Sequence, residues 1–302
     1  MSAYSITILI TVAIYILLAH SLNIITGRAG QISLGHAAFF GIGAYTAGML
    51  YTKLGLPFWI DVPLAALSAG LIGAILGIPC LRVRDDFLAI TTMGINFVVE
   101  AVFLYIPFFG GAMGIGGINL PGWFGREMTK TEFLFVILGV IILIYALDFR
   151  VSRSWIGLAW DSIREDETAA EAMGVDVVRF KVIAFILGSA LAGLAGGFYA
   201  HFLTFIMPQN FGFGQSIVIL SMVVFGGIGT RWGPLVGAVI LGLLPEISRP
   251  IMEYRTLLYG VLLLLLMRFQ PSGLIGSGSI FLRMLKHAVK APKPAGRHGD
   301  SS

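Results

Sequence analysis

The sequence is poor in cysteine and in charged residues, and both shortages restrict the class of protein. A single cysteine, Cys80, can form neither an internal disulfide framework nor a cysteine-based metal site. Charged residues make up 12% of the 302 residues, against roughly 25% in ordinary soluble domains. Hydrophobic residues make up 57%. This composition predicts a protein that crosses a membrane several times.

Sequence signatures of enzymes are missing as well. There is no zinc signature, no Walker sequence and no GxSxG elbow, and the His, Asp and Ser residues form no catalytic cluster. We therefore expect that the chain is not an enzyme, holds no metal or cofactor and does not hydrolyse ATP itself, and a membrane-embedded enzyme is disfavoured. The net charge of +4 does not indicate a nucleic-acid partner, because the basic residues gather at the ends of apolar runs.

Nine apolar runs predict transmembrane helices, because about 20 residues at a rise of about 1.5 Å cross the ~30 Å hydrocarbon core. The predicted fold is therefore all-α, a polytopic membrane helical bundle of about nine spans. The first run lacks the basic residues of a signal peptide, so we expect a retained span. A tenth span or a re-entrant segment at residues 30–48 would change the count. The runs are residues 5–25, 33–51, 61–81, 87–108, 133–147, 182–206, 215–228, 234–247 and 252–267.

Lys and Arg residues are distributed unevenly between the two ends of these runs. Fifteen of the 20 fall on one side and five on the other, and the positive-inside rule places the richer side in the cytoplasm. The N-terminus is then outside, whereas the C-terminus and the polar segment 150–181 are cytoplasmic. Residues 1–281 form the predicted transmembrane domain. Residues 282–302 form a basic cytoplasmic tail with too little apolar sequence to fold, which we expect to be disordered.

The segment 150–181 is the longest charged stretch before the tail. Its composition predicts a helix over residues 161–172, with Asp161 as the N-cap and Gly174 ending the helix. On that helix Ile163, Thr168 and Ala170 fall roughly on one face, opposite charged residues. An amphipathic helix between two spans is suited to press into a soluble partner. The alternative is a solvated helix that merely connects the spans.

Polar residues within the apolar runs are candidates for a translocation path, because each is costly in hydrocarbon. The histidines lie toward the ends of their runs, where we expect an interfacial, partly solvated imidazole. The fourth run carries a polar stripe at helical spacing, which could line a path or merely hydrogen-bond neighbouring helices. The ionisable residues are His20, His36, Glu100, His201 and Glu246. The path candidates are Thr92, Asn96, Glu100, Ser33 and His36.

Three glycine-rich segments are expected to leave helical geometry. Segments 27–35 and 226–237 resemble each other weakly, as an internal repeat would. Each would break or turn the adjacent helix, a feature by which transporters shape a cavity. Close helix packing explains these glycines almost as well. The loop 110–122 is expected on the outer face, as a cap over a cavity, as a contact for an external partner, or as a flexible connector.

Four segments together resemble the LivM-type permease of branched-chain amino acid ABC importers, and the resemblance covers nearly the whole chain. It implies a subunit of the bacterial inner membrane that pairs with a LivH-type permease, with two cytoplasmic ATPase subunits that bind the ATP, and with an external solute-binding protein that delivers a small-molecule substrate. The segments are ITGRAGQISLGHAAFFGIGAYTAG at 25–48, GGAMGI at 110–115, IREDETAAEAMGVDVVRFKVIAFILG at 163–188 and FGGIGTRWGPLVGA at 225–238.

Within this resemblance, the charged segment looks like the EAAxxxG coupling motif of ABC importers. Ala169, Ala170 and Gly174 match the two alanines and the glycine. Thr168 stands where the motif has Glu, with Glu167 one residue earlier. The resemblance implies that this helix docks an ATPase and moves when ATP binds. The implied coupling residues are Arg164, Glu165, Glu167, Thr168, Ala169, Ala170 and Gly174.

The fourth run departs from the family. Asn96, Phe97 and Val98 stand where the family usually has Gly-Glu-Ile, and Glu100 follows one turn later. The substrate is therefore open between leucine, isoleucine or valine and other amino acids, amides or urea. The competing hypothesis is a stand-alone secondary transporter driven by protons through Glu100 or a histidine. A protonophore would inhibit such a transporter, and loss of an ATPase would not.

Overall fold

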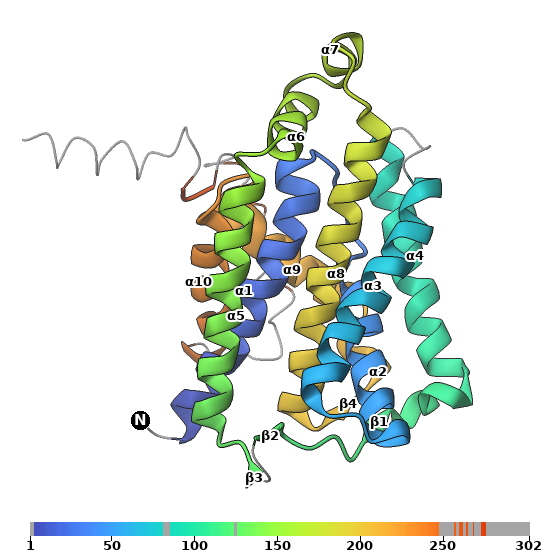
Figure 1. Ribbon diagram of the computed structural model, residues 1–302, viewed down its shortest axis with the longest axis vertical. Coiled ribbons are helices and arrows are strands. Elements are labelled where there is room, and N and C mark those ends of the chain that lie inside the picture. Colours follow the sequence, from blue (N-terminus) through green and yellow to red (C-terminus); the bar gives the residue numbers. More distant parts are fainter. Residues whose placement is uncertain are drawn as a thin grey trace, which may run out of the picture.

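The computed structural model describes residues 3–80, 85–123 and 126–247, together with residues 257, 260, 261, 264, 268 and 273–275. The chain folds into a helical bundle with two short strand pairs (Figure 1). The helices are α1 (Ala3–Leu22), α2 (His36–Leu54), α3 (Phe58–Cys80), α4 (Asp85–Tyr105), α5 (Lys130–Val151), α6 (Trp155–Glu165), α7 (Glu167–Ala172), α8 (Val177–Leu203), α9 (Phe213–Gly226) and α10 (Gly233–Ile247). The short elements are the π-helix η1 (Asn23–Arg28), the 3-10 turns η2 (Pro107–Phe109), η3 (Gly111–Met113) and η4 (Pro208–Phe211), and the strands β1 (Ile115–Gly116), β2 (Gly122–Trp123), β3 (Arg126–Glu127) and β4 (Phe205–Ile206).

Six helices within the described residues are long and apolar enough to cross a membrane, which confirms an all-α, multi-pass membrane protein. The predicted runs 33–51 and 234–247 also contain helices, α2 and α10, although neither is among the six. The ninth run, 252–267, lies largely outside the described residues, as does the tail 282–302. The count of nine and the orientation stay predictions. The six helices are Tyr4–Arg28, Phe58–Ile78, Phe87–Tyr105, Lys130–Val151, Val177–Leu203 and Pro208–Gly226.

Helices α2, α3 and α8 pack closely on one another, while α1 packs against α5, α8 and α10. Small residues permit the closest approach. A Cβ on Gly43 of α2 would lie 2.1 Å from the carbonyl oxygen of Gly193 in α8, so a side chain there would force the helices apart. In lipid, where no hydrophobic effect drives helices together, such backbone proximity is a main source of association.

The segment between η1 and α2 is not helical. After η1 the chain runs through residues 29–35 before α2 begins at His36. Gly30 has φ +72°, and Gly35 lies against the Thr92 carbonyl oxygen, which a Cβ would approach to 2.0 Å. The Leu34 N–H is satisfied by the Thr92 hydroxyl at 3.0 Å. The second predicted span is therefore a helix preceded by non-helical backbone, which a membrane tolerates only where protein or water covers it.

The two ends of the bundle differ. In Figure 1, α6 and α7 project from one end, whereas α1 begins at the other end together with the four strands. There the loop 110–122 is tied down, because β1 pairs with β4 and the His201 Nδ1 lies 2.8 Å from the Asn119 carbonyl oxygen. The second imidazole nitrogen of His201 lies 2.9 Å from Asp61 Oδ2. The loop is thus anchored to α3 and α8 rather than a loose connector.

Candidate functional site

The projecting segment is two helices, so the prediction of one helix over residues 161–172 is wrong. Asp161 lies inside α6, which begins after Ser154, and is not an N-cap. The chain breaks at Asp166, whose φ of −157° is extended and whose side chain accepts a hydrogen bond from Ala169 N at 2.9 Å. A carboxylate that caps the following helix competes with helix continuation, which explains the break. Gly174, at φ +87°, follows the C-cap of α7 as predicted.

The break also changes which residues face inward. Ile163 and Ala170 are buried together with Val177 of α8. Thr168 is exposed, so placing it on the same face as Ile163 and Ala170 was wrong, because the turn at Asp166 resets the helical phase. The outward face of α7 consists of Thr168, Ala169, Glu171 and Ala172, followed by Met173, which is 85% exposed. Glu165 is also exposed.

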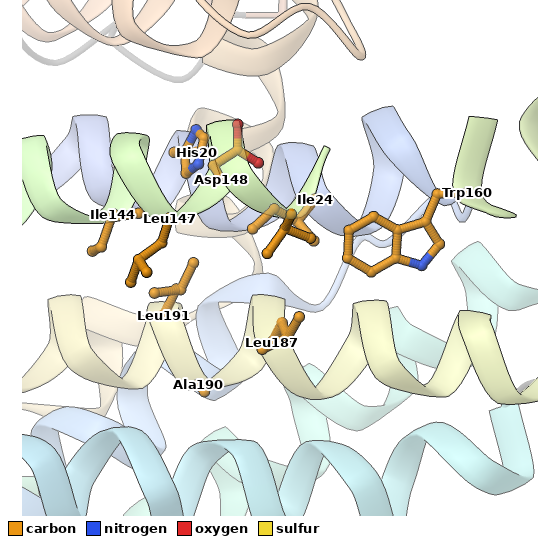
Figure 2. Close-up of a pocket in the computed structure, with 10 residues that line it drawn as sticks. His20, Ile24, Ile144, Leu147, Asp148, Trp160, Leu187, Ala190 and Leu191 are labelled. Carbon is orange, nitrogen blue, oxygen red and sulfur yellow. The ribbon is translucent and has the colours of Figure 1, made fainter. Parts of the chain in front are cut away.

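Two side chains fasten α6 and α7 to the base of α8. Trp160 is 1% exposed, packs with Ile24, Ala29 and Ala184, and donates its Nε1–H to the Phe180 carbonyl oxygen at 2.9 Å. Lys181 pairs with Glu167 at 2.7 Å. The Trp160 indole also closes one end of a cavity of about 240 Å³ between α1, α5 and α8, with His20 and Asp148 on one wall and Leu187 and Leu191 on the other (Figure 2). The helix pair is therefore held rigidly on the bundle.

Arg164 connects α6 to the bundle at a third place. Its aliphatic stem passes Gly30, whose added Cβ would lie 3.7 Å from the Arg164 Cα. Its guanidinium donates a hydrogen bond to the Ile228 carbonyl oxygen at 3.3 Å and lies on Gly229, where a Cβ would come within 1.8 Å of Nη1. This predicted coupling residue therefore points at the bundle, toward both glycine-rich segments.

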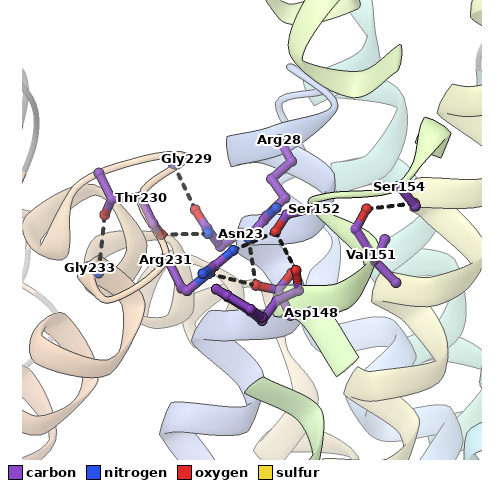
Figure 3. A network of polar contacts seen from close by, with 11 residues as sticks. Asn23, Arg28, Asp148, Val151, Ser152, Ser154, Gly229, Thr230, Arg231 and Gly233 are labelled. Carbon is purple, nitrogen blue, oxygen red and sulfur yellow. Dashed lines mark hydrogen bonds and ion pairs between the residues drawn. The ribbon is translucent and has the colours of Figure 1, made fainter. Parts of the chain in front are cut away.

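These two glycine-rich segments meet directly. Asn23, in η1, donates from Nδ2 to the Thr230 carbonyl oxygen at 3.0 Å and accepts from Gly229 N at 2.8 Å (Figure 3). Gly27 lies against the same backbone, because its Cβ would be 2.5 Å from Gly229 N. The sequence singled out both segments as helix breakers, but it gave no sign that they contact each other.

A buried ion cluster adjoins this contact. Arg28 pairs with Asp148 at 2.5 Å, and the two side chains are 9% and 4% exposed. Arg231 Nε lies 3.6 Å from the same carboxylate, and Arg231 also donates to the Ser152 hydroxyl. Figure 3 shows the cluster joining η1, the end of α5 and the loop before α10. Asp148 was not among the predicted site residues; the available signal was an acidic residue at the end of an apolar run.

The predicted path residues are partly brought together. Asn96 accepts from the Ser216 hydroxyl at 3.0 Å and donates to the Phe211 carbonyl oxygen at 3.2 Å, while Ala37 N donates to the same hydroxyl at 2.9 Å. Thr92 holds Leu34 as described above. These residues thus join α4 to α2 and α9. Ser33 is also buried, and Glu100 is half-buried beside Gly212.

The histidines lie deeper than expected. His20, His36 and His201 are each 0% exposed, so a partly solvated imidazole is wrong for all three in this chain. His36 Nε2 lies 2.6 Å from the Ser21 hydroxyl, and His20 packs on Tyr145 with ring centroids 4.3 Å apart. Tertiary packing decides this burial, because α1, α2 and α8, which carry the three histidines, each pack against several other helices.

Substituting Trp160 tests how firmly α6 is held. We expect Trp160→Ala to destabilise the protein by about 3–5 kcal/mol, because a large buried side chain leaves a cavity. Trp160→Phe loses chiefly the hydrogen bond, worth about 1 kcal/mol. Trp155→Ala is the control, since Trp155 is 85% exposed. Thermal unfolding of the purified protein measures the difference, and equal midpoints for Trp160→Ala and Trp155→Ala would contradict it.

Membrane-length helices, broken backbone next to buried polar groups and a helix pair projecting from one end define a multi-pass membrane transport protein. The chain belongs to the family described as branched-chain amino acid transport system / permease component, whose model matches residues 4–267. This family is a class of transport permease and not a class of enzyme.

Named relatives agree with this assignment. The chain is 34% identical over 303 residues to the high-affinity branched-chain amino acid transport system permease protein LivM of Escherichia coli K12, covering 92% of this chain and 71% of LivM. A probable LivM of Methanocaldococcus jannaschii is 25% identical over 331 residues, with 93% and 96% covered. LivH of Escherichia coli K12 is 25% identical over 289 residues, with 87% and 91% covered. No solved structure matches the chain.

Proposed function

We propose that this protein is a transmembrane permease subunit of an ABC importer for branched-chain or related amino acids. Support comes from the family and from the LivM and LivH relatives, whose names specify branched-chain amino acid transport. The proposed location is the bacterial inner membrane, with about nine spans, the N-terminus outside and the C-terminus in the cytoplasm. The chain forms half of the translocation path and pairs with a related LivH-type permease. An external solute-binding protein delivers the substrate.

The observation that carries the proposal is the attachment of α6 and α7 to broken helices of the bundle. Two cytoplasmic ATPase subunits bind the ATP, and one of them docks on the exposed face of α7. Because Trp160, Lys181 and Arg164 each fix this helix pair to the bundle, movement of the pair must also move η1, α8 and the loop 227–232. A rigid push from the ATPase thereby alternates access to the substrate path. The chain itself performs no catalysis.

The path proposal keeps Thr92, Asn96, Glu100, Ser33 and His36 as candidates. Its support is that Thr92 of α4 binds non-helical backbone before α2 while Asn96 binds Ser216 of α9. Membranes tolerate such non-helical backbone where a cavity or protein covers it. Leucine, isoleucine and valine are the first substrates to test. Other amino acids, amides and urea follow, because the fourth span departs from the family pattern.

The docking face is tested by Ala169→Trp. Ala169 is exposed on α7, so the substitution leaves the buried cluster around Ala170 intact and obstructs only what binds outside. We expect the ATPase subunits to be lost on purification and uptake of radiolabelled leucine to fall at least about tenfold, the effect of roughly 1.4 kcal/mol of lost binding when the ATPase is limiting.

Ala112→Trp is the matched control, because Ala112 is an exposed alanine in η3 near the strand-bearing end of the bundle. It should leave the co-purification of the ATPase subunits unchanged. Wild-type uptake that persists without the ATPases but collapses with a protonophore would instead favour the secondary transporter. Retained ATPases and normal uptake in Ala169→Trp would show that α7 is not the docking face.

A further inference from the structure

The end of α5 carries more positive charge than its neighbours neutralise. Arg28 and Arg231 share one carboxylate, Asp148, and no other described acidic residue forms an ion pair with either. The Arg231 Nε lies 3.6 Å from Asp148 and makes no hydrogen bond among the described residues. Arg153 forms no ion pair with any described residue. Its guanidinium lies 4.0 Å from the centroid of the Phe149 ring, and that of Arg231 lies 4.5 Å from the same centroid. Arg231 is half-buried and shares its anionic partner, so an added anion is favourable there, whereas Arg153 is exposed and has its charge available beside it.

A cavity opens beside these two arginines. It has a volume of about 510 Å³, lies between α5 and α10 and is lined by Ile141, Ile142, Tyr145, Ala146, Phe149, Arg231, Trp232 and Leu235. Its lining is polar at Arg231 and otherwise mainly aliphatic and aromatic. Trp232, 58% exposed, stacks on Tyr145 with ring centroids 5.5 Å apart. Tryptophan and tyrosine are typical of the level at which lipid headgroups meet the hydrocarbon core.

We propose that this cavity binds one anionic phospholipid, with its phosphate on Arg231 and Arg153 and an acyl chain along Ile141, Ile142 and Leu235. Charge complementarity identifies the occupant: the cavity joins the Arg231 guanidinium, which shares Asp148 with Arg28, to an apolar channel between two helices, and Arg153 stacks on Phe149 of its lining. Basic pockets of this kind between transmembrane helices recognise anionic headgroups. Planar guanidinium groups can bind phosphate through paired hydrogen bonds. The same arginines could bind free phosphate, but the aliphatic wall would then stay unfilled.

The proposed lipid site lies between the end of α5 and the loop before α10, both of which adjoin the helix pair α6 and α7. Arg231 belongs to the loop that Arg164 of α6 contacts, and Asp148 lies in the last turn of α5, the helix that leads into the polar segment. Because α6 and α7 lie at this end of the bundle, the proposed function places the lipid in the cytoplasmic leaflet. The choice of leaflet rests on the proposed function, whereas the lipid site itself does not.

The experiment measures lipid binding to the delipidated full-length protein by native mass spectrometry, with phosphatidylglycerol and phosphatidylcholine of identical chains as probes. We expect phosphatidylglycerol to bind more tightly. Arg231→Gln and Arg153→Gln should each weaken it about fivefold, the effect of one arginine near an anionic headgroup. Ala146→Phe, which keeps every charge and fills the cavity, should weaken both lipids. It also keeps the test valid if Arg231→Gln fails to fold.

Arg150→Gln is the matched control, because Arg150 is an exposed arginine of the same helix end that does not line the cavity. It should bind phosphatidylglycerol as the wild type does. Equal affinity for the two lipids, or equal loss in Arg231→Gln and Arg150→Gln, would overturn the proposal. Displacement of the lipid by millimolar inorganic phosphate would overturn it as well and assign a free-anion site. Lipid binding is measured without transport. The result therefore tests the lipid site even if the proposed importer function is wrong.

Discussion

Replacing Asp148 with asparagine is expected to destabilise the folded protein by about 3–5 kcal/mol, the usual effect of removing one partner from a buried ion pair. The Arg28 and Asp148 side chains are 9% and 4% exposed, so the remaining guanidinium cannot recover its hydration. Arg231 loses its ion-pair partner at the same time. The yield of membrane-inserted protein and its thermal midpoint measure the effect.

Glu165→Gln is the control for this prediction, because Glu165 is an exposed carboxylate of α6. It should change stability by less than about 0.5 kcal/mol. The double variant Asp148→Asn with Arg28→Gln should recover part of the loss, since the more deeply buried cation is then removed with its partner and only Arg231 stays unpaired, and the difference gives the coupling energy. If Asp148→Asn is as stable as Glu165→Gln, the cluster does not hold η1 to α5.

Gly27→Ala is expected to have the second large effect, on uptake as well as on folding. The new Cβ would lie 2.1 Å from Asn23 Oδ1 and 2.5 Å from Gly229 N, so the methyl group separates the two glycine-rich segments and breaks the bridge through Asn23. Overpacking of this kind costs about 1–3 kcal/mol or more. Uptake should fall at least about tenfold in the protein that still folds, which corresponds to roughly 1.4 kcal/mol.

Gly139→Ala serves as the comparison in this case. Gly139 lies in α5, and an added Cβ there meets no atom within 4 Å. The substitution should be neutral or stabilise the helix by up to about 1 kcal/mol, because alanine has the higher helix propensity. Both variants are measured for yield and for leucine uptake in membrane vesicles. Equal behaviour would mean that contact between the segments is not needed for transport.

These contacts give a physical account of how one small helix pair could act on a large bundle. Arg164 reaches Ile228 and Gly229, Gly229 contacts Gly27 and Asn23, and Arg28 and Arg231 meet at Asp148. Each link joins a rigid element to non-helical backbone or to an ion pair. Non-helical segments absorb changes in φ and ψ that a continuous helix resists, so they are suitable places for hinges. The opposite end is held instead by β1, β4 and the His201–Asp61 contact.

By itself the sequence determined the class of protein and most of its helices. Low charge and apolar runs of about 20 residues are local properties, and they specify membrane spans without reference to the rest of the chain. Helix ends marked by glycine, such as Gly174, were also predictable, because a positive φ is a local preference. The motif segments indicated the family in the same way.

Only the tertiary structure decided which of these local features meet. Asn23 contacts Gly229 and Thr230, which lie 206 and 207 positions later in the chain. Arg28 pairs with Asp148, which lies 120 positions later. Such contacts depend on how helices pack, which periodicity does not encode. The same holds for Arg164, whose exposed position on α6 suggested an external partner although its guanidinium binds the Ile228 carbonyl. At Asp166 the chain could continue α6 or cap the next helix. In the folded structure the Asp166 carboxylate caps α7 by accepting a hydrogen bond from Ala169 N, so the helix breaks there.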